Sequence, residues 1–154
     1  MKLLGGITAG LMMVLGLTGS LPAQERASSN QGPCTEPFIR QQITKPDANA
    51  IADDDYFFSG ALEKPVVGEA AAEKAFAPVA AQRRNEKRYP LNPDRIVVSP
   101  SGDMAYEYGT GQMSFDERDS GKHIAFTAAY LRVWRAVDGS CKQAAAMFEP
   151  EDQN

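Results

Sequence analysis

The expected fold depends on two stretches, Ile96–Gly109 (IVVSPSGDMAYEYG) and Tyr130–Lys142 (YLRVWRAVDGSCK). Each joins two β-prone runs through a short turn that contains glycine, and the second turn is Asp138-Gly139. An Asp-Gly pair between β-prone runs is a strong hairpin signal. We therefore expect the chain from Arg95 onward to form an antiparallel meander that ends in a strand from Cys141 to Phe148.

Helical signals come before this meander. A first helix is expected to begin near Thr35, with Pro37 in its first turn. A second is expected from Glu69 to about Ala77, and the charged, proline-bounded residues 83–93 are expected to be a connector. Helices first and an antiparallel meander last predict an α+β domain. A strongly curved sheet wrapped on the helices would make a cone with an open end, which is a usual place for a small ligand.

The N-terminal residues 1–23 have the order of a secretory signal peptide: a positive start at Lys2, an apolar run and then Pro22-Ala23. The apolar run is shorter than the ~20 residues of a membrane-spanning helix. We therefore expect cleavage, a periplasmic or secreted protein and no stable membrane anchor, with an uncleaved anchor as the alternative. Residues 24–33 are expected to be a flexible leader, residues 34–150 a single domain and residues 151–154 an acidic tail.

Charge and cysteine content narrow the choice of partners. The chain has 16 Lys and Arg against 20 Asp and Glu, a formal net charge of −4, so it lacks the basic footprint of a nucleic-acid-binding protein. The basic run at residues 83–88 is interpreted as a solvated surface, with steering of an acidic ligand as the alternative. The two cysteines, Cys34 and Cys141, predict a disulfide in an exported protein, and two free buried thiols are the alternative.

The order of segments resembles the nuclear transport factor 2-like (NTF2-like) superfamily, in particular its DUF4440 and SnoaL-like members. The resemblance is carried by Ala52–Phe57, Val66–Ala70, Ser99–Gly109 and Tyr130–Lys142, and it extends over roughly positions 36–149. It implies a cone of helices and a curved antiparallel sheet around a pocket. Relatives often carry Trp before the Lys of the final strand, and Cys141 stands there instead, which supports the disulfide.

The superfamily includes ketosteroid isomerases, polyketide cyclases and dehydratases, whose cavities hold a carboxylate or His base and a hydrogen-bond donor. By this resemblance the isomerase base would fall at Ser59, which cannot act as that base, and residues 34–52 contain no Tyr for the oxyanion. We therefore favour an exported, non-catalytic pocket that binds a small apolar or amphipathic molecule. An isomerase, dehydratase or cyclase with a carboxylate or His base is the alternative.

The candidate bases for that alternative are Glu107, His123 and Asp55, the last within the run of three aspartates that starts at Asp53. The plainer interpretations are that Glu107 lies on the surface, His123 on the surface or rim, and Asp55 in a solvent-facing turn. Glu107 becomes a buried carboxylate only if its side of the strand is concave. A lone His without a nearby Cys pair does not indicate zinc, and no metal or cofactor is expected.

Aromatic residues are the candidates for the pocket wall, with core and cross-strand packing as the plainer interpretation. The candidates are Tyr56, Phe58, Tyr106, Tyr108, Tyr130 and Trp134. Because alternate residues of a strand share a face, Tyr106 and Tyr108 lie opposite Glu107, and the sequence leaves open which side is concave. Arg132 and Arg135 lie on opposite faces, and either could enter the cavity or pair with a carboxylate. A homodimer through the sheet is a further expectation.

Overall fold

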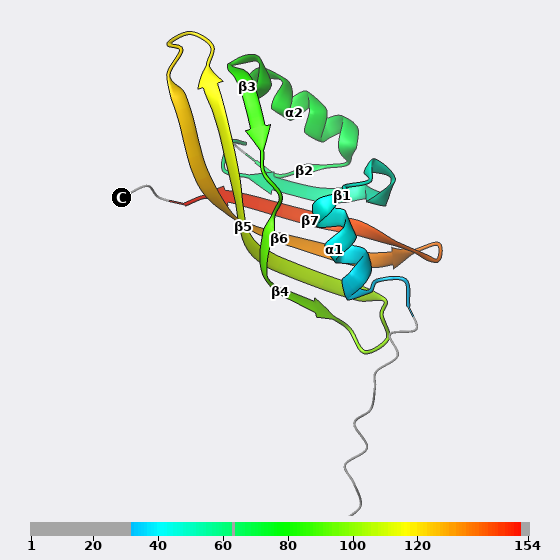
Figure 1. The fold of residues 1–154 in the computed structure, drawn as a ribbon. Coiled ribbons are helices and arrows are strands. Elements are labelled where there is room, and N and C mark those ends of the chain that lie inside the picture. Colours follow the sequence, from blue (N-terminus) through cyan, green and yellow to red (C-terminus); the bar gives the residue numbers. More distant parts are fainter. Residues whose placement is uncertain (1–31, 63, 152–154) are drawn as a thin grey trace, which may run out of the picture.

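The computed structural model describes residues 32–62 and 64–151, so the expected signal peptide, most of the leader and most of the acidic tail lie outside it. Two α-helices lie on one side of a strongly curved sheet (Figure 1). The helices are α1 (Glu36–Thr44) and α2 (Glu69–Ala81), with a short 3-10 turn, η1 (Ala48–Ala50). The strands are β1 (Ile51–Ser59), β2 (Val66–Val67), β3 (Arg83–Arg88), β4 (Asn92–Val98), β5 (Met104–Glu117), β6 (His123–Val137) and β7 (Ser140–Pro150).

The sheet has the order β2-β1-β7-β6-β5-β3, and β4 also pairs with β5. The expected meander is confirmed: β5, β6 and β7 are long antiparallel neighbours, with the turn at Asp138-Gly139 in the positive-φ conformation that tight hairpins use. The sheet as a whole is mixed, because β1 runs parallel to β7. β1 and β7 are not joined by a hairpin, because most of the domain lies between them in the sequence. Their relative direction is therefore not restricted to antiparallel.

Two local expectations were wrong. Residues 83–88, expected to be a connector, form β3, which pairs with the distal half of β5 from Arg83↔Glu117 to Arg88↔Met113. Its charged side chains give no strand signal in the sequence. They suit an edge strand, however, because charge there discourages pairing with other chains. Helix α2 continues to Ala81 through Pro78, which has no N–H to donate to the carbonyl of Lys74, so the backbone hydrogen-bond ladder lacks one bond there.

The disulfide joins Cys34, just before α1, to Cys141, near the start of β7, with the sulfur atoms 2.08 Å apart. It lies in a core cluster in which Ile39 and Trp134 are also almost fully buried. The Thr35 side chain caps α1 by accepting a hydrogen bond from the backbone N–H of Phe38 (3.3 Å), and the Phe38 ring meets Trp134 edge-on. Cap, ring contact and disulfide together fix α1 on the concave face.

In the described part of the chain, no helix has both the length and the apolar character needed to cross a membrane. The elements from Glu36 to Pro150 belong to one continuous sheet and the helices packed on it. The helices leave part of the concave face uncovered, and the candidate site lies there.

Candidate ligand-binding pocket

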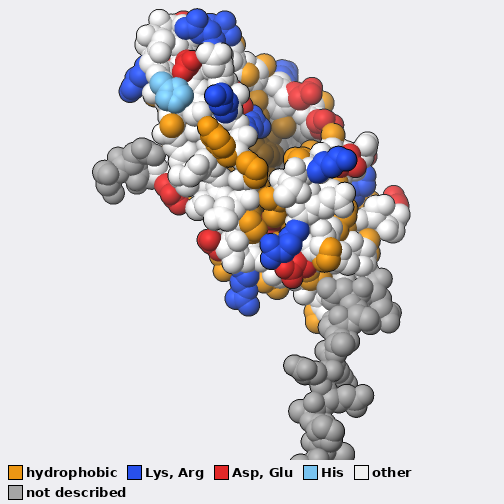
Figure 2. Space-filling view, in the orientation of Figure 1, with side chains coloured by type: hydrophobic (Ala, Val, Ile, Leu, Met, Phe, Trp, Pro, Cys, Tyr) orange, Lys and Arg blue, Asp and Glu red, His pale blue; other side chains and the backbone are white. Residues whose placement is uncertain are grey.

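A cavity of about 650 Å³ lies on the concave face, between the end of α1, helix α2, the β3–β4 connection and the inner faces of β5, β6 and β7. Figure 2 shows it as a hollow with orange apolar side chains around it. Its volume is in the range of small-molecule sites, about 300–1,000 Å³.

Five phenylalanines from five different elements line the apolar wall. They are Phe57 of β1, Phe76 of α2, Phe115 of β5, Phe126 of β6 and Phe148 of β7. Neighbouring rings contact one another: Phe57 lies 5.3 Å from Phe76 and 5.9 Å from Phe148, and Phe115 lies 6.4 Å from Phe126, between ring centroids. Such ring pairs stabilise beyond the area they bury, so they hold the wall in place.

Glycines in β5 let the β3–β4 connection close over the cavity. A Cβ at Gly109 would stand 2.1 Å from the carbonyl oxygen of Asn92, and one at Gly111 would stand 2.8 Å from a methyl carbon of Leu91. Because the atoms close to Gly109 belong to the backbone, a side chain there would push β4 outward, whereas a Cβ at Gly111 would displace the end of the Leu91 side chain. Leu91 and Gly111 both line the cavity.

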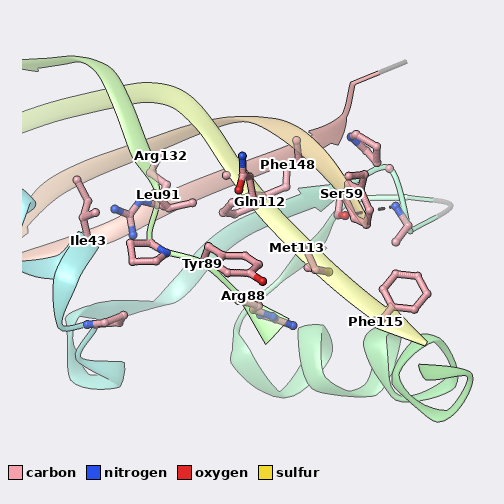
Figure 3. Close-up of a pocket in the computed structure, with 18 of the residues that line it drawn as sticks. Ile43, Ser59, Arg88, Tyr89, Leu91, Gln112, Met113, Phe115, Arg132 and Phe148 are labelled. Carbon is pink, nitrogen blue, oxygen red and sulfur yellow. Dashed lines mark hydrogen bonds between the residues drawn. The ribbon is translucent and has the colours of Figure 1, made fainter. Parts of the chain in front are cut away.

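The charged side chains of the lining are three arginines, Arg83, Arg88 and Arg132, and no described Asp or Glu lines the cavity. Figure 3 shows Arg132 and Ile43 toward one end of the pocket and Phe115 toward the other. Arg83 stacks on the Phe115 ring, 4.4 Å from its centroid. Arg132 and Arg83 therefore lie toward opposite ends of the cavity, and Arg88 lies between these ends (Figure 3).

Arg132 is part of a buried polar cluster beside the cavity. Its Nη2 lies 2.5 Å from Oε1 of Glu107, the residue directly opposite it in the β5–β6 ladder. Glu107 is 0% exposed, and its carboxylate also accepts hydrogen bonds from the hydroxyl of Tyr130 (3.1 Å) and the indole N–H of Trp134 (3.2 Å). Burial and the Glu107 charge raise the pKa of Tyr130, so its hydroxyl stays a donor.

Glu107 is well satisfied, but Arg132 is not. The Nε of Arg132 is buried and has no hydrogen-bond partner among the described residues, and Nη2 makes only the ion pair. The guanidinium also lies over the Trp134 ring, 4.9 Å from its centroid. A buried donor without a partner costs about 1–3 kcal/mol. The unused hydrogen-bonding capacity of Arg132 therefore lies on Nε and Nη2, which are buried within the protein and are not open to the cavity.

The other two arginines share one carboxylate. Glu86 lies 3.4 Å from Arg83 and 2.7 Å from Arg88, and the Arg88 side chain is 72% exposed. Burial raises the pKa of Glu86, but the hydrogen bonds and charges of Arg88 and Arg83 outweigh it, so the pKa lies below its ordinary value. Glu86 is thus ionised at neutral pH and balances one of the two positive charges.

The structure settles which side of the sheet is concave: Glu107 faces inward, and Tyr106 and Tyr108 face outward. These two tyrosines are 41% and 40% exposed, and Tyr56 on β1 is 47% exposed. Phe58 is partly exposed and pairs with the exposed Met147, so it belongs to the same outer side. None of these four lines the cavity. Association of two copies through this outer face stays a prediction.

Tyr130 and Trp134, the other two aromatic candidates, lie on the inner face and are 4% and 2% exposed. They do not line the cavity themselves. Their polar atoms bind Glu107, and the Tyr130 ring stacks on Phe148, which does line it. They therefore support the wall from behind.

The structure does not bring the three candidate bases together, and none of them lines the cavity. Glu107 is engaged by its three donors. His123 is exposed near the far hairpin, with Nδ1 2.8 Å from a carboxylate oxygen of Asp116. Asp55 is buried; one of its oxygens accepts from Gln143 at 3.3 Å and the other has no partner. Burial raises the pKa of Asp55, the Gln143 hydrogen bond partly offsets this, and the Asp54 charge adds to it.

The three adjacent aspartates point in different directions. Asp54 pairs with Arg135 at 2.5 Å, Asp55 is buried and Asp53 is exposed. Within residues 32–62 and 64–151, no group of three or more His, Cys, Asp or Glu side chains is arranged to hold a metal ion. Each candidate arginine of β6 thus pairs with a carboxylate, and Arg132 also enters the cavity wall.

The phenylalanine wall was missed in the sequence. Alternation along β6 carried a usable signal, because Phe126, Ala128, Tyr130, Arg132 and Trp134 share one face. Once the single Trp is assigned to the core, the same face brings Phe126, Ala128 and Arg132 toward the cavity. Phe76 had no comparable signal, since helix α2 is rich in alanine.

No family model and no curated protein matches this sequence. Solved structures do match it. A ketosteroid isomerase-like protein from Erwinia carotovora atroseptica SCRI1043 superposes with a TM-score of 0.56 and 15% identity, over 75% of this chain and 85% of the other. A hexachlorocyclohexane dehydrochlorinase, LinA-type3, from Novosphingobium barchaimii LL02 gives 0.59 and 19%, over 73% and 75%.

A nuclear transport factor 2 (NTF2-like) superfamily protein from Salmonella enterica serovar Typhimurium gives a TM-score of 0.54 and 14% identity, over 68% of this chain and 72% of the other. At these identities the likeness concerns the fold. The expected NTF2-like α+β cone is confirmed, and the function has to be argued from the pocket.

Proposed function

We propose that this protein binds a small apolar or amphipathic molecule in the concave pocket, without catalysis. The observation that carries the proposal is the cavity of about 650 Å³, whose mainly apolar lining includes five phenylalanines. An apolar space of this size, fixed by ring contacts and a disulfide-anchored helix, is preformed, so a ligand has little ordering cost to meet.

The catalytic alternative has less support. A base must come within hydrogen-bond reach of the proton it removes. Glu107, His123 and Asp55 all lie outside the cavity lining, and the lining of the described chain contains no Asp, Glu or His. Ser59, at the position suggested for an isomerase base, does line the cavity, but a hydroxyl is too weak a base for that role. Binding therefore fits the pocket better than proton transfer.

A fluorescence titration with N-phenyl-1-naphthylamine, a neutral probe that brightens in apolar surroundings, tests the proposal. Replacement of Ala128 by Phe is expected to weaken binding by about 10-fold or more, because the added ring occupies ligand space opposite Gly111. The matched control is Ala129→Phe, at the next residue of the same strand but exposed on the outer face. This control should bind like the wild type.

Circular dichroism and thermal melting of both variants show whether they keep the native fold. A folded Ala128→Phe variant that binds the probe as tightly as the Ala129→Phe variant would place binding elsewhere and refute the proposal. Absence of probe binding by the wild-type protein would refute it as well.

We also propose that the protein is an exported, DUF4440-like or SnoaL-like member of this fold. The support is the signal-like order of residues 1–23 and the buried Cys34–Cys141 disulfide, since stable disulfides form in oxidising compartments. N-terminal sequencing of the protein from a bacterial periplasmic fraction is expected to begin at Gln24. Recovery only from the cytosol with Met1 intact would contradict export.

A further inference from the structure

The edge of the pocket at β3 has an excess of positive charge. The described lining has three arginines and no carboxylate, although acidic residues outnumber basic ones in the whole chain. Glu107 is the counter-charge of Arg132, so that pair is neutral. Arg83 and Arg88 share one counter-charge, because Glu86 is the only described carboxylate within ion-pair distance of either. One positive charge at this edge is therefore uncompensated.

The two guanidinium groups that carry this excess charge lie beside the same part of the lining. Arg88 is opposite Met113 in the β3–β5 ladder, and Nη1 of Arg83 lies 3.6 Å from the Met113 sulfur. Nη1 of Arg83 is also 3.4 Å from one Glu86 oxygen, and Nε of Arg88 is 2.7 Å from the other. Figure 3 shows Arg88 beside Tyr89 and Met113. The shared carboxylate thus joins the two arginines into one cluster, the β3 arginine cluster.

The β3 arginine cluster has donors that the described residues do not use. Nε and Nη2 of Arg83, and both Nη atoms of Arg88, make no hydrogen bond within residues 32–62 and 64–151. In that part of the chain the buried donors without a partner belong to Arg132, so the free atoms of Arg83 are accessible. The Arg88 side chain is 72% exposed. Because a guanidinium has five N–H donors, each arginine can bind a ligand oxygen while it keeps its bond to Glu86.

The wall that lies across the sheet from this cluster is apolar. Phe57 of β1 and Phe148 of β7 line it, and β6 and β5 separate these strands from β3 in the sheet. Phe76 of α2 adds a third ring, in contact with Phe57. The cavity is therefore amphipathic, with a cationic edge at β3 and aromatic rings on the far side. Such a space is complementary to an apolar molecule that carries a negative group.

From this arrangement we infer that the ligand is an amphiphile with a single carboxylate, which binds Arg83 and Arg88 at the edge of the cavity. Its apolar chain lies against the phenylalanines of β1, β7 and α2. The inference rests on the proposed binding function and specifies its ligand class. One negative charge matches the one uncompensated positive charge, and charge-assisted hydrogen bonds are about twice as strong as neutral ones. Preference for an acid over the corresponding alcohol is the expected consequence.

The test is displacement of N-phenyl-1-naphthylamine by decanoate and by 1-decanol at neutral pH and low ionic strength, since the two compounds differ in the head group. The wild-type protein is expected to bind decanoate about 10-fold more tightly than decanol. If the probe binds, equal affinities or no displacement by either compound would overturn the inference and leave the proposed binding function standing. Failure of the probe itself to bind would refute the binding function and the inference with it.

Two variants should change the preference in opposite directions. Arg88→Gln leaves Arg83 and Glu86 as a neutral pair, so the ratio of the two affinities should fall close to 1. Glu86→Gln removes the shared counter-charge, so the ratio should rise about 3-fold or more above that of the wild type. The matched control is Arg84→Gln, which changes the net charge as Arg88→Gln does. Arg84 lies on the same strand, outside the cavity lining, and donates to the backbone oxygen of Arg118, so this control should keep the wild-type ratio.

Circular dichroism shows whether each variant is folded. Retention of the wild-type ratio by folded Arg88→Gln, or a ratio that stays the same or falls in Glu86→Gln, would overturn the role of the β3 arginine cluster. An equal loss in Arg84→Gln and Arg88→Gln would show that the overall charge of the protein sets the preference, and would overturn the assignment as well. If Arg88→Gln does not fold, the increase predicted for Glu86→Gln still decides.

Discussion

Replacement of both Cys34 and Cys141 by Ala is expected to lower the free energy of unfolding by about 4–5 kcal/mol, and the melting temperature by about 15 °C. The disulfide spans 107 positions of sequence and closes a loop around nearly the whole domain. Its removal releases the unfolded chain from that constraint. Denaturant unfolding monitored by Trp134 fluorescence measures the change, because the ring lies in the same core cluster as both cysteines.

The expected stabilisation by the disulfide comes from the lower conformational entropy of the cross-linked unfolded chain. It can therefore be distinguished from the packing contribution of the two cysteine side chains. Reduction of the wild-type protein during unfolding should bring its midpoint close to that of the double Ala variant. A double variant within about 1 kcal/mol of the oxidised wild type would contradict this role of the disulfide.

The second large effect is expected at the buried ion pair. Replacement of Glu107 by Gln should lower the free energy of unfolding by about 3–5 kcal/mol, because it leaves the Arg132 charge buried without a counter-charge. Glu107 is 0% exposed and the Arg132 side chain 9%, so water cannot take its place. Urea unfolding of the variant and the wild type measures the difference.

Asp54→Asn is the matched control, because it breaks another carboxylate–arginine pair of the same strand, between Asp54 and Arg135, in which both side chains are substantially exposed. The Asp54→Asn variant should lose less than about 1 kcal/mol of its free energy of unfolding. The double variant Glu107→Gln/Arg132→Gln should be more stable than the Glu107→Gln single variant. An equally small loss for Glu107→Gln and Asp54→Asn would show that the buried pair is solvated in solution and would contradict the structure.

The parts of the fold that could be predicted are those set by local chemistry. Asp138-Gly139 forms the expected turn because both residues take positive φ angles, which Asp and Gly tolerate. Thr35 and Pro37 start α1 as expected, because the cap and the first turn depend only on neighbouring residues. The Cys34–Cys141 bond had only one pairing available to it.

The parts that could not be predicted depend on contacts between distant segments. The sequence leaves open whether Glu107 or the two tyrosines beside it face inward. Glu107 is the buried one, because Tyr130, Trp134 and Arg132 all satisfy it from the neighbouring strand. Tyr106 and Tyr108 are consequently turned outward. The pocket wall takes one phenylalanine from each of five elements, and no local pattern shows that these rings meet.

The most direct test of the central claim is a crystal structure of the protein grown with a saturating concentration of N-phenyl-1-naphthylamine. The expected result is one molecule in the concave cavity, in contact with the lining phenylalanines Phe57, Phe126 and Phe148. A probe molecule bound on the outer face beside Tyr106 and Tyr108, or a cavity filled by the protein's own side chains, would contradict the claim that this pocket is the binding site.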